Sequence, residues 1–440
     1  MNKSIQLTQQ QQSVLQIILA GENVFLTGAA GSGKSFVIKQ LMQLRSAKEF
    51  PILASTGAAA VLVGGRTFHS FFGLGIMEGG MQATIERALN NKKVVRRIQK
   101  IEGFILDEVS MISGETLRAA EIIARLARSN DQAWGGLQIV AVGDFAQLPP
   151  VQSTGYSREK SWAFLDPSWK KSEFIPFALN KNMRTQHSHF IDILGDIRQG
   201  LVSDRVVEFL DEHRKSPPAE VEITRLFPRR NQTDLYNMKC LEELPGDTLI
   251  FPTILTGDSR FHKQLQKYLP IGDQVTLKVG CFVMLRQNDP RGRWVNGSTG
   301  VLIEAKEDFL VVELVDGNRV VKVERASFTM IDADGNEVAC ATNYPINLAY
   351  AATIHKAQGM TLDRVVVNIK SLWEPGQAYV ALSRVRDPNQ LYILEWSKSS
   401  IKSDPIVGQF YGVIDRYMKQ AQEEGHIPQA PTLEASPAEI

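Results

Sequence analysis

The chain has 440 residues and a formal net charge of +1, and 43% of its residues are hydrophobic and 22% charged. This composition is typical of a globular protein with more than one domain, and it excludes a disordered chain. The near-neutral charge also excludes a surface that is basic throughout, so any contact with nucleic acid would be confined to a local basic groove.

Three features of the sequence bear on where in the cell the protein is expected to be found. No stretch approaches the roughly 18 consecutive apolar residues that a membrane helix needs, and the polar segment 1–12 lacks the apolar core of a signal peptide. Cys240, Cys281 and Cys340 are far apart and form no CxxC pair, which argues against a zinc site or a disulfide framework. We therefore expect no membrane partner and a reducing, cytoplasmic setting.

The first segment, up to about residue 198, alternates apolar runs with stretches of helical pattern. These runs predict buried strands of a parallel sheet with helices on both faces. The predicted strands are residues 24–27, 52–55, 104–106, 139–142 and 174–178. Because ligands of such sheets bind at the carboxyl ends of the strands, we expect functional residues there.

Residues 79–99 have a helical pattern that ends in a basic cluster. The cluster consists of Lys92, Lys93, Arg96 and Arg97. It fits either a small inserted element that contacts a polyanion or an ordinary solvated helix, and both interpretations stay open.

A second α/β segment begins at about Leu226 and resumes at Ala349. The interruption between them is rich in β-branched residues over 277–323, with turn signals at Asn-Gly (296–297) and Asp-Gly (316–317). This pattern predicts a small β-barrel inserted into the second α/β unit.

Residues 28–35, Gly-Ala-Ala-Gly-Ser-Gly-Lys-Ser, match the phosphate-binding pattern GxxxxGK[ST] between a predicted strand and a predicted helix. Glycines let the loop wrap its N–H groups around phosphate oxygens, and the helix N-terminus adds a favourable dipole. The residues assigned to the nucleotide are Gly28, Gly31, Ser32, Gly33, Lys34 and Ser35. The lysine is expected to reach the β- and γ-phosphates and the serine hydroxyl to bind Mg²⁺.

An acidic pair, Asp107 and Glu108, follows the predicted strand 104–106. Beside a phosphate-binding loop, Asp107 is expected to hold Mg²⁺ through water and Glu108 to polarise the attacking water, although such a pair can also cap a helix. Gln147 follows the next strand. It fits either a nucleotide sensor that positions water or part of a turn fixed by two prolines, and spacing alone weighs these equally.

Several strings resemble, in order, the motifs of Pif-type helicases of superfamily one. They are residues 55–60 and 67–70 (motifs Ia and Ib), Asp107-Glu108-Val109-Ser110-Met111 (II), residues 143–151 (III), 350–361 (V) and 377–384 (VI). The resemblance covers roughly residues 7–395 and extends to the related RecD and Dda helicases. Residues 134–138, Trp-Gly-Gly-Leu-Gln, fit the Pif type better.

This resemblance implies an α/β protein with two RecA-like P-loop motor domains, each a parallel sheet with helices on both faces. A small SH3-like β-barrel would be inserted in the second. The expected boundaries are 1–198 for the first domain with an insertion near 70–100, 199–276 and 346–420 for the second, 277–345 for the barrel, and 421–440 for a disordered tail. ATP would bind between the motor domains.

The resemblance also assigns roles around the nucleotide. Gln11 falls where the family reads adenine, although Gln9 or Gln10 could fill this role in the repetitive run. Arg184 and Arg384 correspond to arginines that contact the γ-phosphate from opposite sides of the cleft. Without the resemblance, we would expect Arg184 to pair with a surface acid.

The residues expected to contact DNA, or to link it to ATP, are Thr56, Phe68, His69, Thr353, His355 and Lys356. Phe68, Phe71 and Phe72 are candidates for stacking on bases, an interaction that contributes about 1–3 kcal/mol per base. We nevertheless expect at least two of the three phenylalanines to lie in the core.

The implied activity is a 5′→3′ helicase that uses ATP and Mg²⁺ to move along single-stranded DNA and unwind tailed or forked duplex DNA. G-quadruplexes and RNA–DNA hybrids are further candidate substrates, and the direction comes from the resemblance alone. We expect a cytoplasmic, bacterial or phage-type monomer that can dimerise on DNA. A DNA-dependent ATPase that does not unwind, a RecD-like subunit and a non-enzymatic adaptor remain alternatives.

Overall fold

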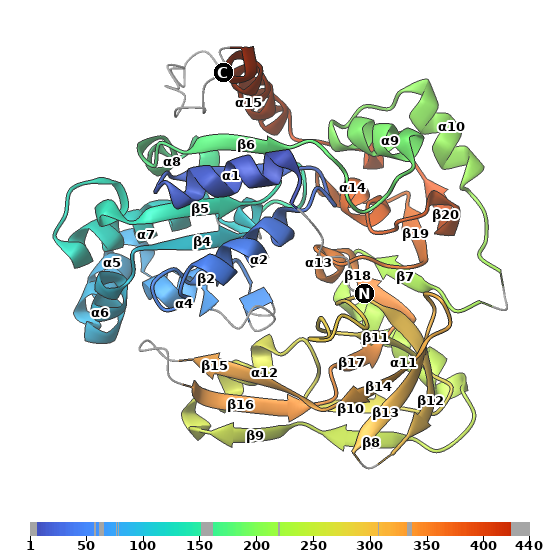
Figure 1. Cartoon of the computed structure of the whole chain (residues 1–440). Coiled ribbons are helices and arrows are strands. Elements are labelled where there is room, and N and C mark those ends of the chain that lie inside the picture. Colours follow the sequence, from blue (N-terminus) through green and yellow to red (C-terminus); the bar gives the residue numbers. More distant parts are fainter. Residues whose placement is uncertain are drawn as a thin grey trace.

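The computed structural model describes residues 7–56, 59–60, 66–75, 77, 79–150, 162–218, 221–306, 308–331 and 337–423. In the part of the chain that it describes, two parallel sheets lie side by side and several antiparallel sheets lie below them in the view of Figure 1. Within the same residues, no helix is long and apolar enough to cross a membrane.

The first parallel sheet has six strands in the order β3-β2-β4-β5-β1-β6. They are β1 (Val24–Gly28), β2 (Ile52–Ala54), β3 (Arg66–Thr67), β4 (Gly103–Asp107), β5 (Gln138–Val142) and β6 (Ile175–Leu179). Five of these strands were predicted, with each end within one residue of its observed place. Strand β3 was not, because two residues leave no readable pattern.

Side chains alternate between the two faces of this sheet. Phe25 of β1 and Phe104 of β4 point into one core, whereas Val24, Leu26 and Ile105 point into another. Helices α1 (Gln9–Leu19) and α2 (Lys34–Leu44) cover the second face. The first face is covered by α4 (Phe68–Phe72), α5 (Gly80–Asn90), α6 (Lys92–Lys100), α7 (Gly114–Arg128) and α8 (Pro167–Lys171). This sheet and its helices form the first unit.

The basic cluster at 92–97 is divided by the packing of α6. Lys92, Lys93 and Arg96 are exposed. Arg97 is 7% exposed and donates to the carbonyl groups of Ser70 (3.1 Å) and Phe71 at the end of α4. Arg97 therefore braces one helix against another, and only the rest of the cluster is available to a polyanion.

The second unit is built on a four-stranded parallel sheet in the order β18-β7-β19-β20. Its strands are β7 (Thr224–Phe227), β18 (Ala351–Thr353), β19 (Val365–Ile369) and β20 (Leu391–Trp396). A separate core joins this sheet to α9 (Ser188–Arg198), α10 (Asp204–Glu212), α11 (Arg230–Glu243), α13 (Ile354–Ala357) and α14 (Gln377–Leu382).

The antiparallel sheets share a third core and lie between β7 and β18 in the chain. Five strands are ordered β14-β13-β12-β11-β17, three are ordered β15-β16-β9, and two pair as β10-β8. Their bounds are β8 (Leu249–Pro252), β9 (Ile254–Gly257), β10 (Gln274–Leu277), β11 (Phe282–Leu285), β12 (Thr299–Ala305), β13 (Phe309–Leu314), β14 (Val320–Glu324), β15 (Ala326–Ile331), β16 (Glu337–Asn343) and β17 (Ile346–Leu348), with α12 (His262–Tyr268) among them. Strands β8 and β9 and most of β10 precede the boundary expected at residue 277, and β17 follows the boundary expected at residue 345. The SH3-like character of this region stays a prediction.

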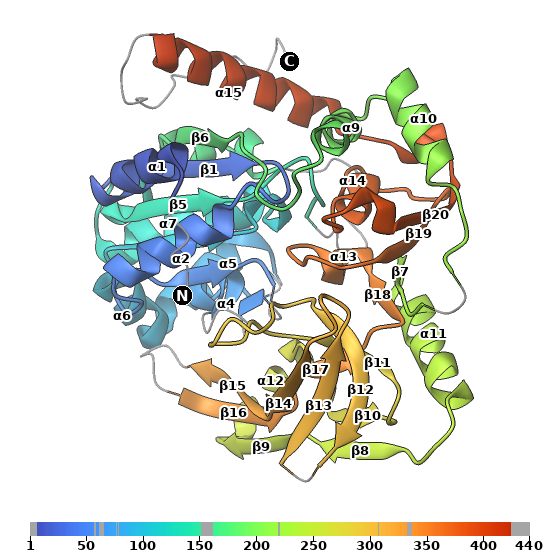
Figure 2. The same ribbon diagram turned by 45° about the vertical axis from the view of Figure 1, so that its right-hand side comes forward.

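The last helix, α15 (Pro405–Glu423), leaves the second unit and lies along the first sheet (Figure 2). Val407 and Ile414 are buried in the core of the first unit, and Phe410 stacks on Phe164 at 4.2 Å between ring centroids. The chain thus returns to its first unit after completing the second. Of the tail predicted for 421–440, residues 424–440 lie outside the described residues.

Candidate functional site

The loop between β1 and α2 depends on its glycines. Gly28, Gly31 and Gly33 have φ angles of 142°, 82° and 92°, a region that side chains disfavour. A Cβ atom on Gly31 would lie 2.5 Å from the Cβ atom of Arg184, and one on Gly33 would lie 2.5 Å from Nε2 of Gln11. The loop therefore needs glycine both for its backbone and for the close approach of its neighbours.

The same loop carries groups that suit a phosphate ligand. The buried hydroxyl of Ser32 has no hydrogen-bond partner among the described residues. The ammonium group of Lys34 donates to the carbonyl oxygens of Gly28 (2.7 Å) and Ala29 (3.2 Å), and Ser35 is exposed in the first turn of α2. Burial lowers the pKa of Lys34, against the attraction of nearby carboxylates. A cation and a free donor at a helix N-terminus fit the phosphates of a nucleotide.

The acidic pair lies at the carboxyl end of β4. Glu108 has φ 54° and ψ 49°, a left-handed conformation that costs a non-glycine residue energy and persists only where the surroundings hold it. Its N–H group donates to Oδ1 of Asp107 at 3.0 Å. Burial, together with the neighbouring Glu108 carboxylate, raises the pKa of Asp107 to about 7. Two adjacent carboxylates of this kind suit a divalent cation, which would offset their repulsion.

Glu108 also touches the second unit. The side-chain amide of Gln358 donates to Oε2 of Glu108 at 3.0 Å, and the other amide atom, Oε1, is buried with no partner among the described residues. Gln358 lies directly after α13, in the string that resembles motif V. The sequence does not predict this contact, because no local pattern indicates that these two segments meet.

Arg184 lies between the two units. The preceding Met183 donates from its N–H group to the carbonyl of Gly31 at 2.7 Å, which holds this segment against the phosphate loop. Arg184 donates to the carbonyl of Ser383 at 2.6 Å and makes no ion pair with a carboxylate among the described residues. Burial and the nearby Arg384 lower the pKa of Arg184 to about 9. The pairing with a surface acid that residue type alone suggested is therefore absent from this part of the chain.

Arg384 is held inside the second unit and is 1% exposed. Its guanidinium donates to the carbonyls of Val380 (2.7 Å) and Ala357 (3.2 Å) and to the hydroxyl of Ser383 (2.7 Å). Burial lowers its pKa to about 10. The structure thus brings Arg184 to the phosphate loop, whereas Arg384 would have to leave these carbonyl groups to reach a phosphate.

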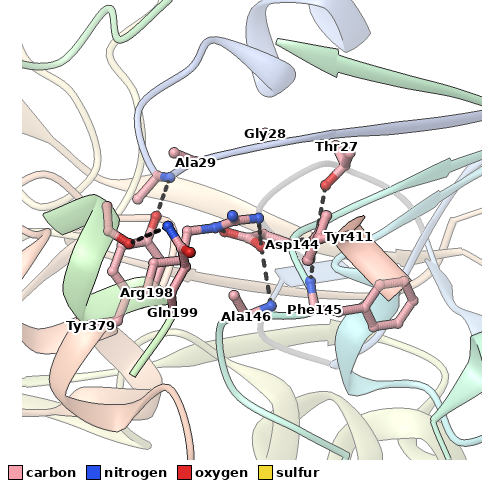
Figure 3. A network of polar contacts seen from close by, with 12 residues as sticks. Thr27, Gly28, Ala29, Asp144, Phe145, Ala146, Arg198, Gln199, Tyr379 and Tyr411 are labelled. Carbon is pink, nitrogen blue, oxygen red and sulfur yellow. Dashed lines mark hydrogen bonds and ion pairs between the residues drawn. The ribbon is translucent and has the colours of Figure 1, made fainter. Parts of the chain in front are cut away.

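The segment after β5 forms a buried polar network (Figure 3). Asp144 accepts hydrogen bonds from Arg198 at the end of α9 and from Tyr411 of α15. Gln147 is 5% exposed, and its carbonyl approaches Gly376 so closely that a Cβ atom there would lie at 2.4 Å. The segment is therefore held by both units, and Arg198 and Tyr411 are members that no motif string indicated.

Gln11 lies beside the phosphate loop and is 2% exposed. Its side-chain oxygen Oε1 accepts from the N–H group of Thr8 at 3.0 Å and so completes a capping box at the start of α1. Gln10 instead accepts from the N–H group of Asn180 at 3.2 Å, and Gln9 is exposed. Of these three glutamines, Gln11 is the one placed beside the nucleotide loop.

The prediction that Phe68 contacts DNA is wrong. Its side chain is 0% exposed and packs at 4.9 Å from Phe72 and 6.3 Å from Phe104, measured between ring centroids. Phe71 and Phe72 are buried as well. Phe68 therefore belongs to the core of the first unit and offers no free face to a base, because the amphipathic α4 turns all three rings inward.

The other predicted DNA contacts lie at the carboxyl ends of strands. Thr56 follows β2, and half-buried His69 lies on α4, where burial lowers its pKa. In the second unit, Thr353 caps α13 by accepting from the N–H group of Lys356 at 3.1 Å, and His355 and Lys356 are exposed. Each unit thus carries its own set of candidate contacts.

The comparisons with known proteins agree with this geometry. The chain matches the family model described as PIF1-like helicase over residues 6–208, and a second model described as helicase over residues 301–398. It is 48% identical over 407 residues to the ATP-dependent DNA helicase Pif1 of Bdellovibrio bacteriovorus, with 92% of each chain covered. The chain belongs to the PIF1-like helicase family. It is also 33% identical to the ATP-dependent DNA helicase PIF1 of Homo sapiens, over 93% of this chain and 64% of that protein.

Solved Pif1 helicases share the fold. The Pif1 helicase from Candida albicans is 33% identical with a TM-score of 0.75, covering 93% of this chain and 100% of its own. Bacteroides sp Pif1 in complex with ADP-AlF4 is 27% identical with a TM-score of 0.81, covering 98% and 100%. Bacteroides Pif1 bound to ssDNA has a TM-score of 0.64 at 26% identity, covering 96% and 99%. The arrangement described here is therefore more similar to the ADP-AlF4 complex than to the ssDNA complex.

Proposed function

We propose that this PIF1-like helicase is an ATP-dependent motor that moves 5′→3′ along single-stranded DNA and unwinds tailed or forked duplexes. The observation that carries the proposal is the junction at the phosphate loop, where both units meet. Gln358 of the second unit contacts Glu108 of the first at 3.0 Å, and Arg184 beside the loop contacts Ser383 of the second unit at 2.6 Å. A ligand at this junction would control how the units sit against each other.

The residues present can perform hydrolysis. Loop N–H groups and Lys34 would hold the phosphates, and Glu108 would take the proton of the attacking water. Ser35 and Asp107 would hold Mg²⁺, which would neutralise charge on the phosphate oxygens. Arg184 stays positively charged even with a pKa lowered to about 9, so it can stabilise charge on the transferring phosphoryl group.

Hydrolysis would be converted into movement by opening of this junction. Loss of the γ-phosphate removes the anion that attracts groups from both units, so the units separate. Thr56 and His69 would hold DNA on the first unit, and Thr353, His355 and Lys356 on the second. Alternating grip during opening and closing would move the chain along the strand. Contacts of this kind are made mainly to phosphates, so binding should weaken with salt.

We also propose the predicted organisation of the chain. The chain would have two motor domains, expected at 1–198 and at 199–276 with 346–420, and an SH3-like insertion expected at 277–345. The packing shifts these boundaries, because α9 lies in the core of the second unit, β8 and β9 pack with the antiparallel sheets, and α15 lies in the core of the first unit. We propose a monomer that acts on DNA in the cytoplasm. Two copies could act together on a fork, since a solved structure describes forked dsDNA unwound by two coordinating Pif1 helicases.

The test is unwinding of duplexes that carry either a 5′ or a 3′ single-stranded tail, with ATP and Mg²⁺. We expect unwinding only from the 5′ tail. Lys34→Ala should abolish it while DNA binding persists, and Lys39→Ala, a change at an exposed position on the same helix α2, should have no effect. Unwinding from the 3′ tail would overturn the direction, and full turnover by Lys34→Ala would overturn the site.

The alternative is a DNA-dependent ATPase that moves or loads without unwinding, or a RecD-like subunit of a larger complex. Both of these kinds of protein would use the same phosphate loop and acidic pair as a helicase. DNA-stimulated hydrolysis without unwinding of either tailed duplex would favour this alternative.

A further inference from the structure

The C-terminal helix α15 reaches the nucleotide site through the hydroxyl group of Tyr411 (Figure 3). This hydroxyl donates its proton to Oδ1 of Asp144 at 2.9 Å. Since a phenol has one proton, its oxygen accepts from the hydroxyl of Thr27 at 2.9 Å and from the N–H group of Phe145 at 3.0 Å. The hydrogen-bonding capacity of Tyr411 is thereby filled.

All three partners border the nucleotide loop. Thr27 directly precedes Gly28 at the end of β1, and Asp144 and Phe145 begin the segment that contains Gln147. The Tyr411 hydroxyl therefore links the residue that precedes the phosphate loop to the segment that follows β5. It comes from a helix more than two hundred residues further along the chain.

The Asp144 carboxylate is an anion held inside the protein. It is 0% exposed and accepts from Arg198 at 2.8 and 3.2 Å and from the N–H group of Ala146 at 3.1 Å. Burial alone would raise the pKa of Asp144, but the guanidinium of Arg198 outweighs it and the pKa lies below its ordinary value. The charge of Asp144 also acts on Lys34, whose ammonium group it attracts.

The aromatic ring of Tyr411 completes the enclosure of this ion pair. The guanidinium of Arg198 lies 4.3 Å from the centre of the ring, which favours the charged arginine. Arg198 ends α9, a helix whose apolar side chains lie in the core of the second unit. Tyr411 thus contacts both members of the pair, one through its ring and one through its hydroxyl.

We propose that Tyr411 is a positioning residue for ATP hydrolysis, which holds Asp144 and the following segment so that Gln147 and Lys34 face the nucleotide correctly. The inference rests on the proposed function. Removal of the hydroxyl would leave the N–H group of Phe145 and the Thr27 hydroxyl without this partner, and the segment would relax. Because Gln147 would act on the attacking water, the loss should fall on kcat more than on KM.

A role of Tyr411 in folding alone can be distinguished experimentally from this positioning role. Docking of α15 depends on apolar side chains, Val407, Phe410 and Ile414, which Tyr411→Phe leaves in place. The same change also keeps the ring over Arg198. Tyr417→Phe is the matched control on the same helix, since the Tyr417 hydroxyl is buried and has no hydrogen-bond partner in the described part of the chain.

The experiment measures kcat and KM for ATP, with saturating oligo-dT and Mg²⁺, for the full chain and for Tyr411→Phe and Tyr417→Phe, beside their thermal unfolding. We expect kcat of Tyr411→Phe to fall about tenfold with KM within about twofold, and Tyr417→Phe to match the unchanged chain. A Tyr411→Phe variant with unchanged kcat, or with a loss no larger than its loss of folded protein, would overturn the inference.

A second variant tests the network itself. Thr27→Val removes one partner of the Tyr411 hydroxyl and keeps the shape of the side chain. If both residues act through one network, the double variant should lose no more kcat than Tyr411→Phe alone, whereas multiplied losses would contradict it. If the unchanged chain itself shows no DNA-stimulated hydrolysis, the proposed function fails, and that result is distinct from failure of Tyr411→Phe alone.

Discussion

The side-chain amide of Gln358 donates a hydrogen bond of 3.0 Å to the carboxylate of Glu108, and so joins the two units at the residue assigned to activate water. Gln358 follows α13, which carries His355 and Lys356 on its exposed side. A DNA strand held by these residues would therefore act on Glu108 through a single side chain. If these residues hold DNA, this contact would give DNA a direct route by which to stimulate hydrolysis.

The first prediction follows from that contact. Gln358→Ala should lower the ratio of ATPase rates with and without oligo-dT by about tenfold, because the DNA-contacting segment loses its hold on Glu108. Gln358→Glu should lower the ratio further, since a second carboxylate would repel the first. Gln82→Ala, an exposed change on α5, is the control and should leave the ratio unchanged. A normal ratio in Gln358→Ala would contradict the proposed route.

Arg184 and Arg384 should both support turnover, whereas Arg384 should also support the stability of the fold. Arg184→Lys and Arg384→Lys keep the charge but lose the planar fork, and each should lower kcat by about a hundredfold or more while ATP binding persists. Arg384→Ala should in addition lower the melting temperature, since Arg384 bonds to the carbonyls of Val380 and Ala357. Steady-state kinetics, binding of a fluorescent nucleotide and thermal unfolding give the three readouts. Normal turnover in either lysine variant would remove that arginine from the site.

The raised pKa of Asp107 predicts a dependence of stability on pH. Its ordinary value is 3.8 and the folded protein raises it to about 7, so between these values the folded state holds more protons than the unfolded chain. Stability should therefore fall as pH rises from about 4 to about 7 and change no further through this group. Asp107→Asn should remove this loss of stability. Without Mg²⁺, it should raise the melting temperature at pH 8 by on the order of a few degrees.

The same variant should show little or no gain at pH 4, where the carboxyl group is protonated in the folded protein. Asp131→Asn, a change at an exposed position, serves as the control. An equal gain for Asp107→Asn at both pH values would show that proton binding by this carboxylate does not set the difference.

Phe68 should prove to be a core residue. Phe68→Ala should lower the free energy of unfolding by about 3–5 kcal/mol, because it leaves a cavity between Phe72 and Phe104, and Phe68→Leu should lower it by less. The affinity of the folded fraction for oligo-dT should not change. Denaturant unfolding and fluorescence anisotropy measure these two quantities. Weaker DNA binding at unchanged stability would restore the stacking role.

The sequence by itself determined the local features. Apolar runs such as 139–142 predicted five strands of the first sheet, because a strand buried on both faces must be apolar throughout. The phosphate loop was equally readable, since its glycines, Lys34 and Ser35 lie within eight consecutive positions. Resemblance in the order of the motifs then led to the family. All of this information is carried by neighbouring residues.

Only the tertiary structure decided which distant groups meet. Tyr411 and Asp144 are hydrogen-bonded although α15 belongs to no motif, and Gln358 reaches Glu108 from the other unit. Phe68 lies in a motif string yet faces the core, because the face that a short helix buries depends on what packs against it. Such contacts arise from the crossing of chain segments that local pattern does not encode, so the polar network around the nucleotide loop became visible only once both units were placed.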